Sequence, residues 1–281
     1  MKFTVDEFRA WKNKKVTLLG MSGVGKTYLS SMLRDSQWFH FSGDYRIGTR
    51  YLDEPILDMI KQQAMKVPFL NELLRNDWIY IRNNIKVHDL GPVLSFVGQL
   101  GNPESGGVEL DDFIKRQAQY RKAEIATMFD VPSFIEKAQN IYGYDHFVND
   151  VGGSLCELDE PGVVEILAEH TLILYIQVTN SEEENKLINR AQSAPKPLYY
   201  RAEFLQQQLG IYLQENNLQY AAQMEPDDFT RWIFPHLFHS RIPRYEAIAK
   251  QGYTVTSEEV ANVKNENDFL KLLEMAISRQ S

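Results

Sequence analysis

The chain has 281 residues, of which 43% are hydrophobic and 24% are charged, and its formal net charge is −8. This composition is typical of a globular protein, and the acidic balance argues against a general binder of nucleic acid or of an anionic membrane, which needs clustered cations. The single cysteine, Cys156, excludes an intramolecular disulfide and a four-cysteine zinc site. The first residues have no apolar signal core, and the longest apolar run, 171–178, is far shorter than a membrane-spanning helix. We therefore expect a cytoplasmic protein.

Short apolar runs alternate with amphipathic stretches along the chain. The apolar runs predict strands at 16–19, 38–41, 146–149, 172–178 and 253–255. Helices are predicted at 26–35, at 54–76 with a break at Pro68, and at 111–128, 182–192, 199–215, 227–250 and 266–279, whereas 77–109 is rich in turn residues. Strands that alternate with helices predict an α/β fold in which helices sandwich a parallel sheet.

A glycine-rich motif directly follows the first predicted strand and opens the first long helix. It reads Gly20-Met21-Ser22-Gly23-Val24-Gly25-Lys26-Thr27 and fits the phosphate-loop pattern G-x-x-x-x-G-K-[ST]. In this pattern backbone N–H groups face phosphate oxygens, the lysine reaches the β- and γ-phosphates, and the threonine hydroxyl binds Mg²⁺. The motif predicts a P-loop NTPase fold that binds ATP and Mg²⁺. The nucleotide-binding residues are expected to be Gly20, Ser22, Gly23, Val24, Gly25, Lys26, Thr27 and Tyr28.

The motif identifies a nucleotide site but not a reaction, so the residues after the second strand matter. Asp44 follows that strand in Ser42-Gly43-Asp44-Tyr45-Arg46. Strand C-termini face the ligand crevice of an open parallel sheet, where a carboxylate can accept the proton of an acceptor hydroxyl. Arg46 could hold an anionic group of that acceptor. Alternatively, Asp44 is an ordinary turn residue after glycine.

Four further segments follow in an order that resembles the shikimate kinase family. They are Tyr120-Arg121-Lys122-Ala123-Glu124, Asp150-Val151-Gly152-Gly153-Ser154, Arg190 followed by Pro195-Lys196-Pro197-Leu198, and Arg241-x-Pro243-x-Tyr245-Glu246-x-Ile248-Ala249. The resemblance extends more loosely to nucleoside monophosphate and gluconate kinases. It implies that Asp44, Arg121, Gly152, Gly153 and Arg241 surround a small-molecule acceptor. It also implies that Arg190, or Lys196 beside it, closes over the phosphates from a lid. Gln192, Ser193, Pro195 and Pro197 in this segment predict that the lid is mobile without nucleotide.

The sequence departs from the family pattern in four places, of which one is Ser154, where the family's turn has a third glycine. The family's D-x-D motif is Ser42-Gly43-Asp44 here, so the first carboxylate is missing. We expect Asp150 to replace that carboxylate as a Mg²⁺ ligand. Alternatively, Asp150 is an ordinary turn residue at the end of a strand. Two insertions, about 50–112 and 199–239, interrupt a predicted single domain, 1–281, whose lid and second insertion together occupy 190–239.

The first insertion has two interpretations. It either caps the acceptor or docks a protein partner, or it is a scaffold elaboration around its aromatic residues. Segment 50–112 has six basic and ten acidic residues, which argues against a nucleic-acid acceptor.

Two functions remain open. The first is a kinase that transfers the γ-phosphoryl group of Mg²⁺-ATP to a small molecule, with Lys26, Asp44 and Arg190 as its catalytic residues. The second is a regulatory or assembly ATPase with no phosphoryl acceptor. A GTPase is disfavoured because the chain has no Asn-Lys-x-Asp motif. Zinc at His236 and His239 is disfavoured because no third ligand lies near them in the sequence, and Cys156 has no basic neighbour to activate its thiol.

Overall fold

The computed structural model describes residues 1–280 and contains a five-stranded parallel sheet. The strands are β1 (Lys15–Leu19), β2 (Trp38–Ser42), β3 (His146–Asp150), β4 (Leu172–Gln177) and β5 (Tyr253–Thr256). Their order is β2-β3-β1-β4-β5, and each neighbouring pair is parallel. The predicted α/β fold with a parallel sheet is therefore confirmed. The central strands β1 and β4 are apolar because both of their faces are covered.

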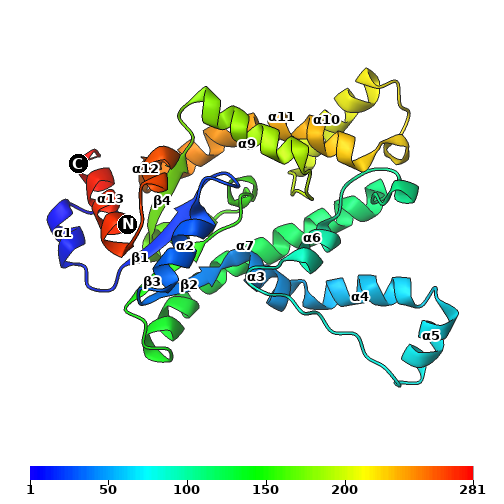
Figure 1. Cartoon of the computed structure of the whole chain (residues 1–281), viewed down its shortest axis with the longest axis horizontal. Coiled ribbons are helices and arrows are strands. Elements are labelled where there is room, and N and C mark those ends of the chain that lie inside the picture. Colours follow the sequence, from blue (N-terminus) through cyan, green and yellow to red (C-terminus); the bar gives the residue numbers. More distant parts are fainter. Residues whose placement is uncertain (281) are drawn as a thin grey trace. The chain divides into compact units, whose positions relative to one another are not determined.

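The chain forms two compact units, each made of segments that are separate in the sequence. Figure 1 colours the ribbon from the N-terminus to the C-terminus, so these segments can be followed by residue number. The first unit contains residues 1–43, 124–195 and those from Arg231 onward. The second contains 44–123 and 196–230, and thus most of the two insertions that the sequence predicts. Helices α7 (Leu110–Asn140) and α11 (Pro226–Ala249) contribute residues to both units.

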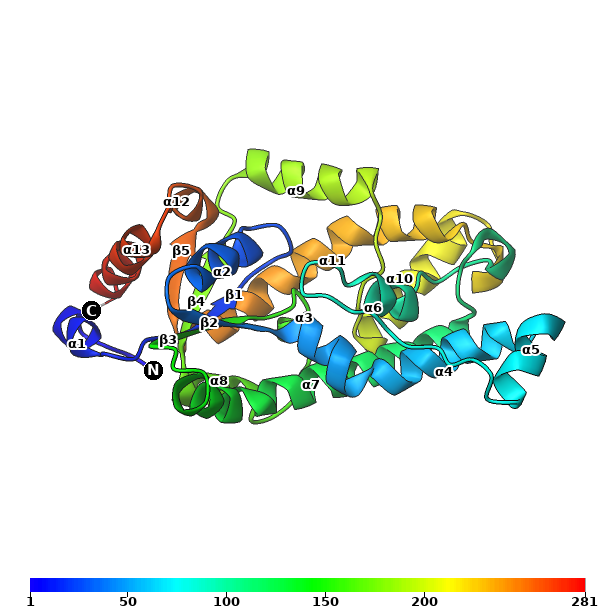
Figure 2. The ribbon, with the colours of Figure 1, turned by 60° about the horizontal axis from the view of Figure 1, so that its bottom comes forward.

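Helices cover both faces of the sheet in the first unit. Helix α2 (Lys26–Arg34) packs on β2 and β3, and Figure 2 shows α8 (Val163–His170) and the C-terminal part of α7 on the opposite side. Helices pack on both faces because successive side chains of a strand point to opposite faces of the sheet, and β2 has large aromatic side chains on both. Phe39 and Phe41 on one face of β2 pack against Phe134 of α7, and Trp38 on the other face packs edge-on against Phe269. The remaining helices of this unit are α1 (Val5–Ala10), α9 (Ser181–Ser193), α12 (Ser257–Ala261) and α13 (Glu266–Ser278).

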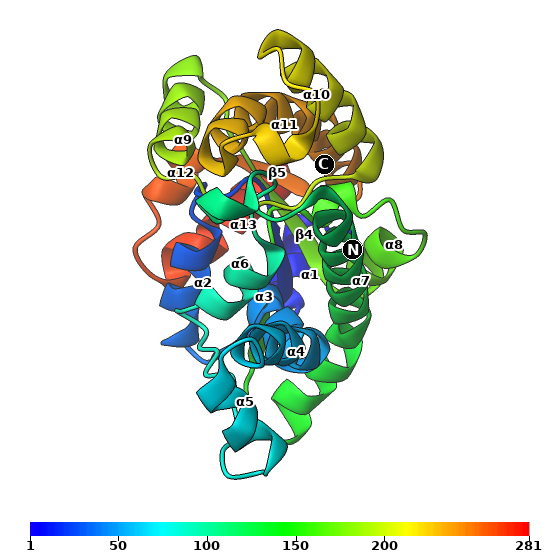
Figure 3. The same cartoon turned by 90° about the vertical axis from the view of Figure 1, so that its right-hand side faces the viewer.

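The second unit is helical among its described residues. It contains α3 (Gly43–Arg46), a π-helical turn (Ile47–Tyr51), α4 (Asp53–Ala64), α5 (Pro68–Arg75), α6 (Gly91–Val97) and α10 (Ala202–Glu215), several of which are labelled in Figure 3. Its own core includes Ile56, Phe96, Tyr120 and Tyr199.

Several helices differ from the sequence prediction, among them α6 (Gly91–Val97), which lies in the predicted turn-rich segment 77–109, and α12 (Ser257–Ala261), which was not predicted. Helix α7 continues to Asn140, twelve residues past the predicted end at 128, although Pro132 lies inside it. Helix α8 was not predicted from the sequence. Pro68 does separate α4 from α5, as predicted, because proline is favoured at the first position of a new helix.

Candidate nucleotide site

The glycine-rich loop between β1 and α2 uses backbone conformations that favour glycine. Gly23 and Gly25 have φ angles of 94° and 103°, a region that side chains with a Cβ rarely adopt. Gly25 is the N-cap of α2, so the free N–H groups and the positive end of the helix dipole lie at this loop. A Cβ at Gly20 would lie 2.7 Å from the carbonyl oxygen of Ile176 on β4, which explains the glycine there.

Lys26 folds its side chain into this loop. The residue is 6% exposed, and Nζ donates hydrogen bonds to the carbonyl oxygens of Gly20 at 2.7 Å and Met21 at 2.8 Å. The ammonium group is thus held where loop N–H groups would receive an anion. Val24 is buried, whereas Ser22, Thr27 and Tyr28 are exposed, and the Tyr28 hydroxyl donates to the carbonyl of Val263 at 3.2 Å.

Arg190 lies directly on the loop, although it is distant in sequence. A Cβ placed on Gly23 would come within 1.8 Å of Nη2 of Arg190, so the guanidinium group packs on the Cα of that glycine. Arg190 is in the last turn of α9. The sequence predicted that Arg190 faces the phosphates, and this position places it beside the phosphate loop.

Contacts with α11 hold α9 in place. Gln192 and Arg231 exchange side chain-to-backbone hydrogen bonds of 3.1 and 3.0 Å, and His239 Nε2 lies 2.7 Å from Glu184 Oε1. Lys196, the alternative lid residue, belongs to the second unit. The mobility of the lid stays a prediction.

Asp150 ends β3 beside the end of β2. Its side chain is 10% exposed, and its Oδ2 lies 3.6 Å from Nε2 of His40, which has no hydrogen-bond partner. Ser42, where the family has a carboxylate, pairs with Asp150 in the parallel register. Oxygen ligands from a carboxylate and a hydroxyl are those that Mg²⁺ prefers, so Asp150 and Thr27 fit such an ion chemically. Residues 1–280 contain no group of three or more His, Cys, Asp or Glu side chains that could hold a metal by themselves.

A buried polar network lies next to the phosphate loop, and the sequence did not reveal its internal pairing. Arg241 Nε donates to Glu157 Oε1 at 3.3 Å, and the two side chains are 7% and 0% exposed. Ser154 donates to Glu124 at 2.7 Å. The Tyr245 hydroxyl lies 2.5 Å from the carbonyl oxygen of Gly153 and 3.2 Å from that of Gly20, so it connects the Gly152-Gly153 turn to the loop.

The predicted acceptor residues are divided between the two units. Gly152, Gly153 and Arg241 belong to the first, and Asp44, Arg46 and Arg121 to the second. Within the second unit, the Tyr120 hydroxyl donates to Asp44 Oδ1 at 3.4 Å, and the Arg46 guanidinium lies over the ring of Tyr51 at 5.6 Å. The convergence of these residues on one acceptor stays a prediction.

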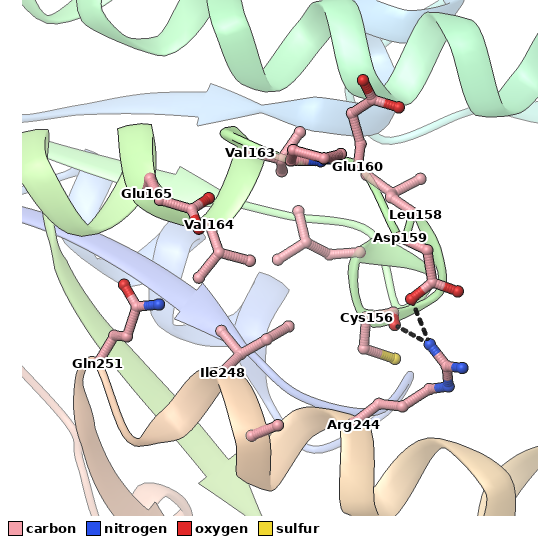
Figure 4. A pocket seen from close by; sticks show the side chains of 13 residues that line it. Cys156, Leu158, Asp159, Glu160, Val163, Val164, Glu165, Arg244, Ile248 and Gln251 are labelled. Carbon is pink, nitrogen blue, oxygen red and sulfur yellow. Dashed lines mark hydrogen bonds and ion pairs between the residues drawn. The ribbon is translucent and has the colours of Figure 1, made fainter.

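The first unit also contains a pocket of about 470 Å³ that no sequence motif indicated (Figure 4). Apolar side chains from the segment after β3, from α8 and from α11 form much of its wall. Arg244 donates to Asp159 Oδ1 at 2.6 Å and to the Cys156 carbonyl at 3.4 Å. Burial raises the pKa of the Cys156 thiol to about 12, which agrees with the expectation that it is not a nucleophile.

No family model matches the sequence, and no curated protein matches it. Among solved structures, a 1.7 Å crystal structure of shikimate kinase from Bacteroides thetaiotaomicron is similar to this chain with a TM-score of 0.40 and 14% sequence identity. The match covers 95% of this chain and 96% of that chain. No helix among residues 1–280 is long and apolar enough to cross a membrane. The parallel sheet and its flanking helices define an α/β protein with a glycine-rich turn after its central strand.

Proposed function

We propose that the protein is a P-loop kinase that transfers the γ-phosphoryl group of Mg²⁺-ATP to a small-molecule acceptor. The observation that carries this proposal is the cationic lining of the loop: Lys26 lies inside it and Arg190 packs on Gly23. Phosphoryl transfer needs little covalent chemistry from the protein. It needs alignment of donor and acceptor and cations beside the transferring group.

Each residue has a role in this proposal. Backbone N–H groups of the loop bind the phosphates, while Lys26 and Arg190 stabilise the negative charge that develops during transfer. Asp44 accepts the acceptor's hydroxyl proton as that oxygen bonds to the γ-phosphorus, and the bond to the leaving oxygen of ADP breaks. Thr27 and Asp150 would hold Mg²⁺, which would offset the negative charge of the phosphates. Arg46, Arg121, Gly152, Gly153 and Arg241 would bind the acceptor.

One observation favours the second candidate, a regulatory or assembly ATPase. Arg241 already has a buried carboxylate partner in Glu157, which gives this arginine a structural role that needs no acceptor. An ATPase would use the same loop and the same Mg²⁺ ligands, and protein partners would bind through the inserted segments. Hydrolysis would then drive a conformational change.

An acceptor screen separates the two functions. Purified protein is incubated with Mg²⁺-ATP and one candidate per reaction from panels of small hydroxy acids, sugars, polyols and nucleoside monophosphates, and ADP release is measured. Lys26→Ala provides the background. A kinase gives release well above the rate without acceptor, together with a phosphorylated product detected by mass spectrometry. Hydrolysis that no acceptor stimulates, with no phosphorylated product, would favour the ATPase.

A further inference from the structure

Arg190 is a cation on the loop between β1 and α2 whose charge no other side chain offsets. Among residues 1–280, its guanidinium group forms no ion pair and no side-chain hydrogen bond. Leu187, three residues earlier on α9, is buried and also contacts the loop, because a Cβ on Gly23 would lie 3.1 Å from its Cδ2 atom. One face of α9 thus lies on the loop. A guanidinium group without a carboxylate partner keeps its charge and its N–H groups available for an anion.

Helix α9 is tied to α11 directly after Arg190. Gln192 Nε2 donates a 3.1 Å hydrogen bond to the carbonyl oxygen of Arg231, and Arg231 Nε donates a 3.0 Å bond to the carbonyl oxygen of Gln192. These reciprocal bonds fix the two backbones relative to each other, because each side chain binds the main chain of the other residue. They hold the last turn of α9, which carries Arg190.

A second contact joins the same two helices nearer the start of α9. His239 Nε2 lies 2.7 Å from Glu184 Oε1, and His239 Nδ1 lies 2.9 Å from the carbonyl oxygen of Pro235 on its own helix. The contact with Pro235 orients the ring, so that its other nitrogen faces α9. The first turn of α9 is held as well, because the Ser257 hydroxyl of α12 donates to Glu183 Oε2 at 2.6 Å.

We propose that the contacts between α9 and α11 fix Arg190 on the loop before a nucleotide binds, which makes Glu184, Gln192, Arg231 and His239 positioning residues. Helix α9, which Figure 2 shows over the loop between β1 and α2, is then a fixed part of the nucleotide site. Only the chain after α9 remains available as a mobile lid. A binding group that is already held in place costs less to order when the ligand binds, which raises the affinity. This inference rests on the proposed nucleotide binding, but not on whether the γ-phosphoryl group goes to an acceptor or to water.

Removal of both contacts tests the proposal. Glu184→Ala with Gln192→Ala, called the untied variant, removes one side chain from each contact. Glu182→Ala with Asn189→Ala removes the same types of side chain from exposed positions of α9 and is the matched control. Alanine is the best helix former, so none of these changes opposes the helix. Circular dichroism verifies that each variant is folded.

Hydrogen exchange of α9, followed by mass spectrometry, gives the first readout. Without nucleotide, α9 should be protected in the wild-type protein and in the control, and addition of ADP should change this protection little. In the untied variant α9 should exchange at least about threefold faster, because the hydrogen bonds that hold it are lost. Equal exchange in the untied variant and the wild-type protein, or an unprotected α9 that ADP protects, would overturn the proposal.

Nucleotide affinity gives the second readout, measured by calorimetry with Mg²⁺ and the non-hydrolysable ATP analogue AMP-PNP. The Kd of the untied variant should be about three- to tenfold higher than that of the wild-type protein and the control. Glu184→Gln, which keeps a hydrogen-bond acceptor for His239, should have the wild-type Kd. When Arg190→Ala is already present, removal of the two contacts should change the Kd little, because they act through that arginine.

The outcomes distinguish this inference from the proposed function. An equal increase in Kd with and without Arg190 would overturn the positioning role, and so would a wild-type Kd in the untied variant; the proposed function would stand in both cases. A wild-type protein that does not bind AMP-PNP would overturn the proposed function and this inference together.

Discussion

The Arg241–Glu157 ion pair provides a sharp test of the buried network. Arg241→Ala removes the cation and leaves the Glu157 carboxylate, which is 0% exposed, without its charge partner. Breaking a buried pair in this way costs about 3–5 kcal/mol of the free energy of unfolding, because a charge then stays buried without compensation. Such a loss corresponds to a melting temperature lower by roughly 10 °C in a protein of this size.

Arg244→Ala is the matched control, since Arg244 lies on the same helix and pairs with Asp159 at the surface. The side chains of that pair are 27% and 57% exposed, so its loss should cost about 1 kcal/mol or less. Urea denaturation followed by circular dichroism measures both variants. The double variant Glu157→Gln with Arg241→Met removes both charges and should recover much of the stability that Arg241→Ala loses.

Equal stability of Arg241→Ala and Arg244→Ala would refute the structural role of the ion pair. In that case a specific loss of acceptor-stimulated turnover in Arg241→Ala would favour the acceptor role instead. If Arg241→Ala is unstable, acceptor binding has to be measured on the double variant.

Three further predictions concern the remaining groups. Lys26→Ala should weaken nucleotide binding and turnover, and unchanged ATP affinity by calorimetry would contradict the phosphate-loop assignment. Asp44→Asn should bind ATP normally but transfer the phosphoryl group to an acceptor about 10²–10⁴-fold more slowly. Full acceptor-stimulated turnover in this variant would exclude Asp44 as the proton acceptor. Arg121→Ala should mainly raise the KM for the acceptor. The Cys156 thiol, whose pKa burial raises from 9.0 to about 12, should resist iodoacetamide in the folded protein. Because only the unfolded thiol ionises between those values, its contribution should lower the free energy of unfolding as the pH rises above 9, and that loss should be absent in Cys156→Ala.

The sequence by itself determined the strands and their environment. The apolar runs at 16–19 and 172–178 mark β1 and β4, because strands covered on both faces need no polar side chains. It also located the G-x-x-x-x-G-K-[ST] pattern between β1 and α2, since that pattern is carried by local residue order. The end of α7 could not be found in this way. Pro132 is ordinarily a helix-breaking signal, and here the helix continues through it.

Only the tertiary structure decided which distant groups meet. The contact between Arg190 and Gly23, the pairing of Arg241 with Glu157, and the position of His40 beside Asp150 join residues from different elements. No local sequence pattern encodes such pairs, because the packing of the helices on the sheet determines which side chains meet. From the sequence alone, each of these residues could be paired with many others. Helix α5 is a similar case: its amphipathic pattern predicts a helix with an apolar face, but only the fold reveals that the helix has no buried residue.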